Sequence, residues 1–181
     1  AVAYIGGDIA HSKTDMSPEL IDQLSRLFKN LSDICPTIII AGNHDCNLNN
    51  RSRMDCLSPI VDNLKHPNLH YLKDTGVYKC ADVQFVVWDV WDTKKDYIKA
   101  KDVEGDTKIV LFHGTVDRCE TDLGFRLPSD VKITQFKGYD MGLLGDIHKR
   151  QHLNKTETIS YCGSLVQQNH GEGLDHGYLL W

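Results

Sequence analysis

Short apolar runs, each followed at once by a polar cluster that contains glycine, are the feature that most constrains the fold. The runs are typical of buried strands, and the clusters carry Asp, Asn and His side chains. In an open α/β sheet, residues just beyond the carboxyl ends of the strands face the crevice in which ligands bind. The pattern therefore predicts several strands that deliver polar side chains to one site. The clusters are Gly-Asp-Ile-Ala-His at 7–11, Gly-Asn-His-Asp at 42–45, Phe-His-Gly at 112–114, Gly-Asp-Ile-His at 145–148 and Tyr-Cys-Gly-Ser at 161–164.

Strands and helices alternate in the first part of the chain, and strands follow one another in the rest. Ser17-Pro18 predicts the start of a helix, with Ser as the cap and Pro in the first turn. A second amphipathic helix is expected between Met54 and Leu64, and the charged segment 92–106 is expected to be a solvated loop or helix face. We expect the 83–90 strand to lie near a sheet edge. The order favours an α/β fold with two packed mixed sheets flanked by helices. Strands are expected at about 2–5, 37–41, 69–72, 77–80, 83–90, 108–112, 142–144, 158–161 and 177–181.

Composition narrows the class of protein. The 181 residues suffice for one core, so we expect a single domain over 1–181. A net charge of −5 excludes a protein that binds nucleic acid through a large positive net charge. The apolar runs are too short to span a bilayer, and no signal peptide is visible. The six cysteines lack Cys-x-x-Cys spacing, which argues against a zinc knuckle and favours reduced thiols in a reducing, cytoplasmic setting.

Taken in order, four of these clusters resemble the motifs of the calcineurin-like metallophosphoesterases. The segments 145–151 and 161–172 are further similar to one branch, the SbcD-type nuclease subunits of double-strand-break repair and their phage and large-virus recombination relatives. The resemblance spans nearly the whole chain. It implies the four-layer sandwich of that family and a pair of divalent ions, with Mn²⁺ expected and Fe, Zn or Ni also compatible with oxygen and imidazole ligands.

The resemblance also implies roles for individual residues. Asp8 would bridge the two ions, Asn43 and His113 would bind the second, and His148 the first. His44 would stabilise charge at the phosphate or protonate the leaving oxygen, and His11 would contact the phosphodiester. Further residues are expected to orient a neighbour (Asp45) or to contact phosphate or DNA (Arg51, Lys149, Arg150, Ser164 and His170), whereas His66, His70, His152 and His176 are interpreted as ordinary surface or core residues.

Two positions depart from the family pattern. The family begins with an Asp-x-His motif on an earlier strand, but only seven residues precede Asp8. Because a strand and its crossover need on the order of 30 residues, we expect the chain to be incomplete at its N-terminus. The family also places a histidine where Asp146 stands. Either Asp146 binds a metal through oxygen, or it faces solvent and water takes its place.

Three functions remain open at this point. The first is metal-dependent hydrolysis of DNA phosphodiester bonds by an exonuclease or endonuclease subunit. By resemblance, its partner would be an SMC-type ATPase, and the full-length protein could be a homodimer. We expect no association with a membrane and no capping domain of the kind found in the family. The second is a phosphatase or cyclic-nucleotide phosphodiesterase on the same scaffold. The third is a non-catalytic binding domain, motivated by the missing motif and by Asp146.

Overall fold

Two separate β-sheets organise the chain in the computed structural model, which describes residues 1–181. One sheet has three strands and the other has six. The smaller sheet belongs to a first unit, Ala1–Lys73, and the larger sheet to a second unit, Asp74–Trp181. The expected α/β class with two sheets is confirmed.

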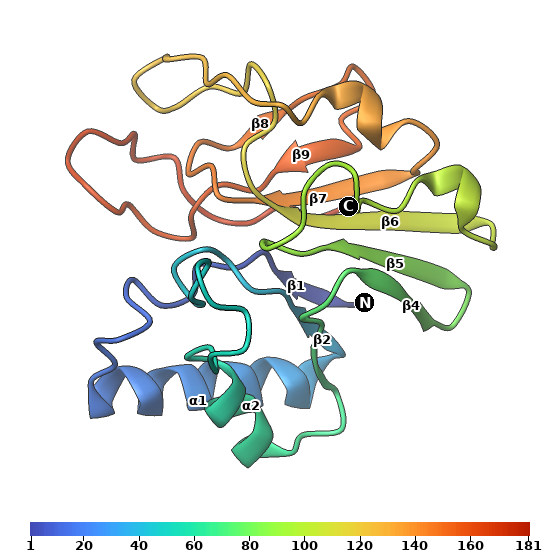
Figure 1. Ribbon diagram of the computed structural model, residues 1–181. Helices are drawn as coiled ribbons and strands as arrows, with labels where there is room; N and C mark the ends of the chain where they lie inside the picture. Colours follow the sequence, from blue (N-terminus) through green and yellow to red (C-terminus); the bar gives the residue numbers. More distant parts are fainter. The chain divides into compact units, whose positions relative to one another are not determined.

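The first unit is a parallel sheet with helical crossovers. Its strands β1 (Ala3–Ile5), β2 (Thr37–Ile39) and β3 (Leu69–Tyr71) lie side by side in chain order, and both pairings are parallel. The crossovers are α1 (Pro18–Ile34) and α2 (Ser58–Leu64), which Figure 1 shows next to each other. Because all three strands are parallel, their carboxyl ends lie at the same end of the sheet.

The predicted start of α1 is confirmed at the residue level. The Ser17 side chain accepts a hydrogen bond from the backbone N of Leu20, and Pro18 occupies the first turn. The apolar face of α1 packs on the sheet and on α2. That core consists of Leu24, Phe28, Ile39, Leu57, Ile60 and Leu69.

The second helix is shorter than its apolar pattern predicts. It begins at Ser58 rather than near Met54, which is 69% exposed. The buried carboxylate of Asp55 accepts hydrogen bonds from the backbone N of Leu57 and of Ser58. These bonds satisfy amides that lack partners at a helix start, so the helix begins after this turn.

The second unit is a mixed sheet with a parallel centre. Its order is β4-β5-β6-β7-β9-β8, in which β5, β6, β7 and β9 are parallel and the two edge strands are antiparallel to their neighbours. The carboxyl ends of β6, β7 and β9 therefore lie at the same end of the sheet. The bounds are β4 Gly76–Cys80, β5 Val83–Trp88, β6 Thr107–His113, β7 Met141–Gly145, β8 Gln151–His152 and β9 Ile159–Tyr161.

One sequence-based expectation for this unit is wrong, and two are confirmed. The 83–90 segment forms β5, which lies next to the edge strand β4, although most of its residues are buried. The charged side chains of the 92–106 segment are mostly exposed, while Ala100 and Val103 hold the segment in the core. No strand forms at 177–181, where Tyr178 and Leu180 are 77% and 89% exposed. Strand β8 was not anticipated.

The core of the second unit is aromatic. Trp88, at the end of β5, stacks on Tyr97 with ring centroids 4.5 Å apart and an interplanar angle of 1°. Phe112, Phe136 and Tyr139 surround the same indole. No helix in the chain combines the length and the apolar character that crossing a membrane requires.

Candidate functional site

In the first unit, two loops meet beyond the carboxyl ends of β1 and β2. The loop after β1 carries Asp8 and His11, and the turn after β2 carries Asn43 and His44. An Asp8 carboxylate oxygen, Oδ1, accepts a hydrogen bond of 2.8 Å from the backbone N of His44. The sheet register therefore brings two of the sequence clusters together, as the strand-end argument predicts for neighbouring parallel strands.

Asp45 ties these two loops to each other. Its side chain is fully buried, and Oδ1 accepts hydrogen bonds of 3.0 Å from the backbone N of Ile9 and of Ala10. Its other oxygen accepts one of 2.8 Å from the backbone N of Gly42. A buried carboxylate with three amide donors is well satisfied, so Asp45 fixes the spacing of the loops that carry Asp8 and Asn43.

Close packing and backbone strain mark the same loops. Asp8 has a φ of 53°, a left-handed conformation that non-glycine residues rarely adopt. A Cβ at position 42 would collide with the backbone N and the carboxylate of Asp8, so only glycine fits there. Strained residues that the surroundings hold in place cluster at ligand sites.

His11 and His44 are paired in the first unit. Their rings stack with centroids 5.8 Å apart, and Nδ1 of His44 lies 2.8 Å from the carbonyl oxygen of His11. Because that carbonyl can only accept, Nδ1 of His44 carries the proton in this contact. Both side chains are exposed, so each can reach a ligand in solution.

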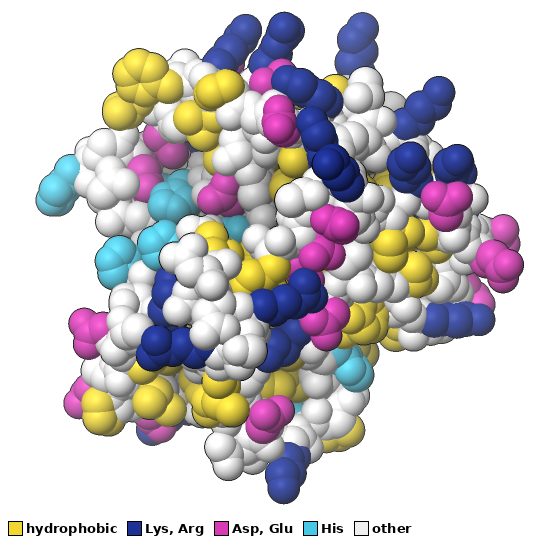
Figure 2. Space-filling model, viewed as in Figure 1, with side chains coloured by type: hydrophobic (Ala, Val, Ile, Leu, Met, Phe, Trp, Pro, Cys, Tyr) yellow, Lys and Arg dark blue, Asp and Glu magenta, His cyan; other side chains and the backbone are white.

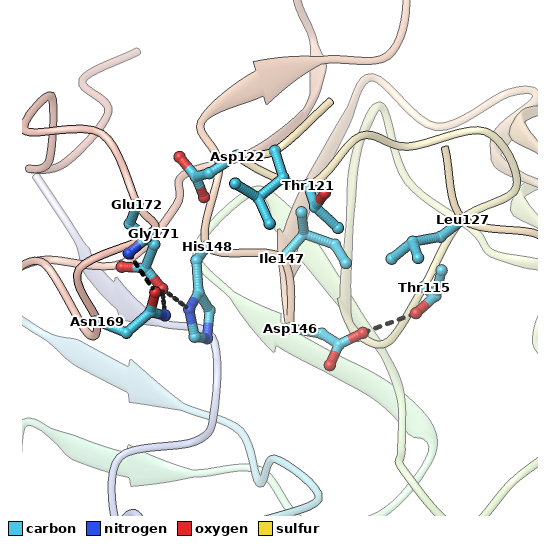
Figure 3. A pocket seen from close by; sticks show the side chains of 11 residues that line it. Thr115, Thr121, Asp122, Leu127, Asp146, Ile147, His148, Asn169, Gly171 and Glu172 are labelled. Carbon is cyan, nitrogen blue, oxygen red and sulfur yellow. Dashed lines mark hydrogen bonds and ion pairs between the residues drawn. The ribbon is translucent and has the colours of Figure 1, made fainter. Parts of the chain in front are cut away.

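In the second unit, β6 and β7 end at neighbouring polar residues. His113 closes β6 with 4% of its surface exposed, and Asp146 follows β7 directly. Nε2 of His113 and Oδ1 of Asp146 are 3.9 Å apart. Thr115 donates a 2.9 Å hydrogen bond to Oδ2, the other oxygen of Asp146 (Figure 3). The carboxylate is thus held with one oxygen toward the His113 ring, not turned out into solvent.

Asp146 is also strained, with a φ of 93°. Such a conformation costs about 1–3 kcal/mol in a non-glycine residue and persists where neighbouring contacts fix it. The two acidic residues that sequence motifs single out as metal ligands, Asp8 and Asp146, thus both have positive φ values.

His148 lies one residue beyond Ile147 and faces a loop that returns from β9. Its Nδ1 is 2.7 Å from Oε1 of Glu172, a contact that Figure 3 shows directly. Burial alone would raise the pKa of Glu172, but hydrogen bonds from His148 and from the backbone N of Gln168 outweigh it and lower the pKa. Glu172 is therefore a carboxylate at neutral pH.

A cavity of about 360 Å³ opens beside Asp146 and His148. Apolar side chains form one part of its wall and polar groups of the two long loops form the rest (Figure 3). The cavity is of the size that small ligands occupy. The lining residues are Thr115, Thr121, Asp122, Leu123, Leu127, Asp146, Ile147, His148, Asn169, Gly171 and Glu172.

The residues expected to contact phosphate are placed as follows. Lys149 pairs with Glu120 at 3.1 Å, and Arg150 approaches Asp175 at 3.4 Å. The Ser164 hydroxyl is 2.8 Å from Nδ1 of His176. Arg51 and His170 are exposed in loops. Their contacts with phosphate stay predictions, and those of Lys149 and Arg150 would compete with the acidic partners.

The thiols near the clusters are not nucleophiles. All six cysteines are free. Burial, together with the charges of Asp45 and Asp55, raises the pKa of both Cys46 and Cys56 to about 12. Burial also raises the pKa of Cys162. A thiol that stays protonated at neutral pH neither attacks nor binds a metal readily.

A sequence model of the family described as "Calcineurin-like phosphoesterase" matches residues 2–150, which include strand-end clusters of both units. The chain belongs to the calcineurin-like phosphoesterase family. This phosphoesterase is also 45% identical over 193 residues to a protein of Acanthamoeba polyphaga mimivirus named "Uncharacterized protein R555". The match covers all of this chain and 14% of the viral protein, so the chain spans a small part of that relative's length.

The residues of this phosphoesterase fit the divalent metals that its family binds. Asp146 presents one oxygen beside the buried His113 ring, while Thr115 engages the other. His148 has its Nδ1 engaged by Glu172, which leaves Nε2 as the nitrogen that can bind an ion. Imidazole and carboxylate donors without thiolates suit Mn, Fe, Zn or Ni. Family membership thus gives the chain the scaffold of the metal-dependent phosphoesterases; its own activity and the ion that it holds stay predictions.

Residue-level reasoning from the sequence missed Thr115, Glu172 and His176. Glu172 is 24 residues from His148 in the chain, and no spacing rule links two such residues. The one available signal was the resemblance of 161–172 to the nuclease branch, which marks the segment without assigning a role to its final glutamate. His176 was interpreted as an ordinary residue, yet it lies against both Ser164 and Glu172.

Proposed function

We propose that this chain is the metal-dependent catalytic core of a DNA nuclease that hydrolyses phosphodiester bonds. The observation that carries the proposal is the way in which segment 161–172 folds onto 145–151. The backbone N of Ser164 donates to the carbonyl oxygen of His148, and Glu172 holds the His148 ring. These two segments are the ones that resemble SbcD-type nucleases, and their association in one loop cluster supports a shared role.

The proposal assigns roles to the chain's own residues. Asp8, Asn43, His113, Asp146 and His148 would hold two divalent ions, which supply Lewis acidity and lower the pKa of water. His44 would donate a proton or a hydrogen bond toward the leaving oxygen. His11 would contact the phosphodiester, and its stacking and carbonyl contact would also hold the His44 ring in place. Asp45 would keep the two loops of the first unit in register.

Charge distribution favours substrate binding through the metals and a few local cations. In Figure 2, Lys and Arg side chains are interspersed with Asp and Glu over the visible face, in keeping with a net charge of −5. We therefore expect Arg51, Lys149, Arg150, Ser164 and His170 to add phosphate contacts near the site rather than to form a continuous basic track.

The test measures cleavage of an end-labelled DNA duplex with Mn²⁺ and with Mg²⁺. We expect Mn²⁺-dependent products from the wild-type protein and none from His113→Asn. Asp22→Asn, which changes an exposed helix residue, serves as the control with unchanged activity. Folded protein that binds Mn²⁺ but leaves DNA intact would contradict the nuclease proposal.

The same assay includes a small aryl phosphomonoester and a cyclic nucleotide. Much faster turnover of either one than of DNA would favour a phosphatase or cyclic-nucleotide phosphodiesterase. Metal binding without turnover of any substrate would favour a non-catalytic binding domain. By resemblance, we also propose an SMC-type ATPase partner, a homodimer of the full-length protein and Mn²⁺ as the ion; co-purification of the partner and the mass of the native complex test the first two.

A further inference from the structure

Glu172 is a nearly buried carboxylate on a long exposed loop. Only 5% of its side chain is exposed, although the neighbouring residues 165–171 are exposed. An ionised side chain is withdrawn from water only where several donors compensate for the lost hydration. The groups that contact Glu172 therefore indicate the role of this carboxylate.

Donors converge on both oxygens of Glu172. Oε1 accepts hydrogen bonds of 2.7 Å from the Asn169 amide and from Nδ1 of His148. Oε2 accepts one of 2.7 Å from the backbone N of Gln168 and lies 3.7 Å from Nε2 of His176. The Asn169 amide, Nδ1 of His148 and the backbone N of Gln168 all donate, so only a group that accepts at both oxygens satisfies these three. Nε2 of His176 instead lies 2.8 Å from the carbonyl oxygen of Gly173.

The contact with Glu172 determines the tautomer of His148. A carboxylate accepts only, so Nδ1 of the ring must carry the proton. The lone pair then resides on Nε2, the nitrogen that remains available for an ion. A ring held by a carboxylate is also more basic toward a metal than one held by water.

The backbone of the same loop holds His148 from another side. The N of Ser164 donates a 3.0 Å hydrogen bond to the His148 carbonyl oxygen. Gly163 has a φ of +79°, and a Cβ there would lie 2.6 Å from that oxygen. The loop thus contacts both the main chain and the ring of His148. Two such contacts are expected of a loop that holds His148 in position, and not of a chance surface contact.

From these contacts we infer that Glu172 is a positioning residue, which fixes the Nδ1–H tautomer and the orientation of His148 so that Nε2 faces a divalent ion. The inference rests on the proposed function, because it deepens the role of His148 as a ligand. Glu172 itself does not touch substrate or metal. The Asn169 side chain and the backbone N of Gln168 hold Glu172 in place in turn (Figure 3 shows Asn169).

The experiment compares wild-type protein with Glu172→Gln and Glu172→Asp. Gln has the same shape, but its NH₂ group would face a donor at one of the two oxygen positions. Asp keeps the charge on a shorter chain and is expected to restore part of the effect. Asp175→Asn is the matched control, because Asp175 is in the same loop, carries the same charge and is 95% exposed.

The first measurement uses metal-free, ¹⁵N-histidine-labelled full chain, with His148 assigned from its missing signal in His148→Gln. We expect the Nδ1–H tautomer in the wild type and in Asp175→Asn, and a shift toward Nε2–H in Glu172→Gln. The second measurement is the Mn²⁺ affinity followed by electron paramagnetic resonance. Loss of such a carboxylate partner weakens metal binding about 10- to 100-fold, so we expect that loss in Glu172→Gln and a smaller one in Glu172→Asp.

An unchanged tautomer or an unchanged Mn²⁺ affinity in Glu172→Gln would overturn the inference. Equal losses in Asp175→Asn would overturn it too, because they would point to loop charge and not to the His148 contact. Failure of the proposed function looks different: wild-type protein would then bind Mn²⁺ without cleaving DNA, while both Glu172 measurements kept their expected outcomes.

Discussion

Tyr161 links two of the motif loops through a single hydroxyl. The side chain is fully buried; its oxygen donates a 2.6 Å hydrogen bond to the carbonyl of Gly114 and accepts one of 2.8 Å from the backbone N of Val116. Both partners belong to the loop that follows His113. A residue at the end of β9 thus fixes the loop at the end of β6.

Tyr161→Phe removes this hydroxyl and takes away the side-chain partner of the part-buried Gly114 carbonyl and of the buried Val116 amide. We expect the free energy of unfolding to fall by about 1–3 kcal/mol, because unsatisfied buried groups lose their hydration without compensation. Urea unfolding measures the change. Tyr178→Phe, at a 77% exposed position, should leave stability unchanged. Equal stability of Tyr161→Phe and wild type would mean that the loop is held by other contacts.

Asp55 gives the first unit a dependence on pH. Burial alone would raise the pKa of this carboxyl, but hydrogen bonds from Lys73 and Ser58 outweigh it and lower the pKa below its ordinary value of 3.8. A group whose folded pKa is lowered stabilises the fold above its unfolded pKa, and this stability is lost as the pH falls through the folded value. We therefore expect Asp55 to contribute fully above about pH 4.

The variant Asp55→Asn tests this dependence. Urea unfolding between pH 6 and pH 2.5 should show wild type more stable by about 1–3 kcal/mol at pH 6, because the variant loses acceptors for buried donors. The difference should shrink below pH 4, where the wild-type carboxyl takes up its proton. Asp22→Asn, on the exposed face of α1, should follow the wild-type curve. A difference between wild type and Asp55→Asn that is constant with pH would contradict the assignment.

At the scale of elements, the apolar runs predicted which segments form buried strands better than they predicted where each strand begins and ends. Continuous apolar runs such as 37–41 and 108–112 correspond to β2 and β6, because buried parallel strands show no alternation. The 83–90 segment lies next to the edge strand β4, as its alternation predicts, although most of β5 is buried. Segment 177–181 has strand-like composition but no partner strand, and pairing partners cannot be read from a local pattern.

The same limit applied to side chains. Asp8, Asn43, His44, His113, Asp146 and His148 stand in recognisable clusters, so their types and places could be predicted. Glu172, Thr115 and Tyr161 act through contacts with residues 24, 31 and 45 or more positions away. Such contacts depend on sheet order and loop path, which no short motif encodes.

The aromatic group around Trp88 is the element-scale determinant of the second unit. Trp88 is 1% exposed, stacks on Tyr97 and donates a hydrogen bond of 3.1 Å to the carbonyl of Ile98. Trp88→Ala should cost about 3–5 kcal/mol, the range for large aromatic truncations that leave a cavity. Chemical unfolding followed by far-ultraviolet circular dichroism measures it.

Position 181 offers the control for that prediction. Trp181 is 53% exposed, so Trp181→Ala should change stability by no more than about 0.5 kcal/mol. If both substitutions cost the same, the aromatic group would not be the stabilising centre of this unit. Trp88→Phe should fall between the two, because it keeps a ring but loses the hydrogen bond and part of the packing.

At the scale of the whole molecule, the family resemblance assigns metal ligands to residues of both units, Asp8 and Asn43 in the first and His113, Asp146 and His148 in the second. The three tryptophans (88, 91 and 181) all belong to the second unit. Tryptophan fluorescence therefore reports the unfolding of that unit alone. A ligand change made in the first unit can be detected in the second only if metal binding couples them.

We expect Mn²⁺ to raise the midpoint of the fluorescence-monitored thermal transition of the wild type, since a ligand at 100 times its Kd stabilises the native state by about 2.7 kcal/mol. His113→Asn should lose most of that shift, and so should Asp8→Asn, although position 8 is in the other unit. Asn tolerates the φ of 53° at position 8, so the comparison tests the lost charge and not the backbone. Asp22→Asn should keep the full shift. If Asp8→Asn also kept it, the ions stabilising the second unit would not be held by Asp8, and the assignment of Asp8 as a ligand of those ions would be wrong.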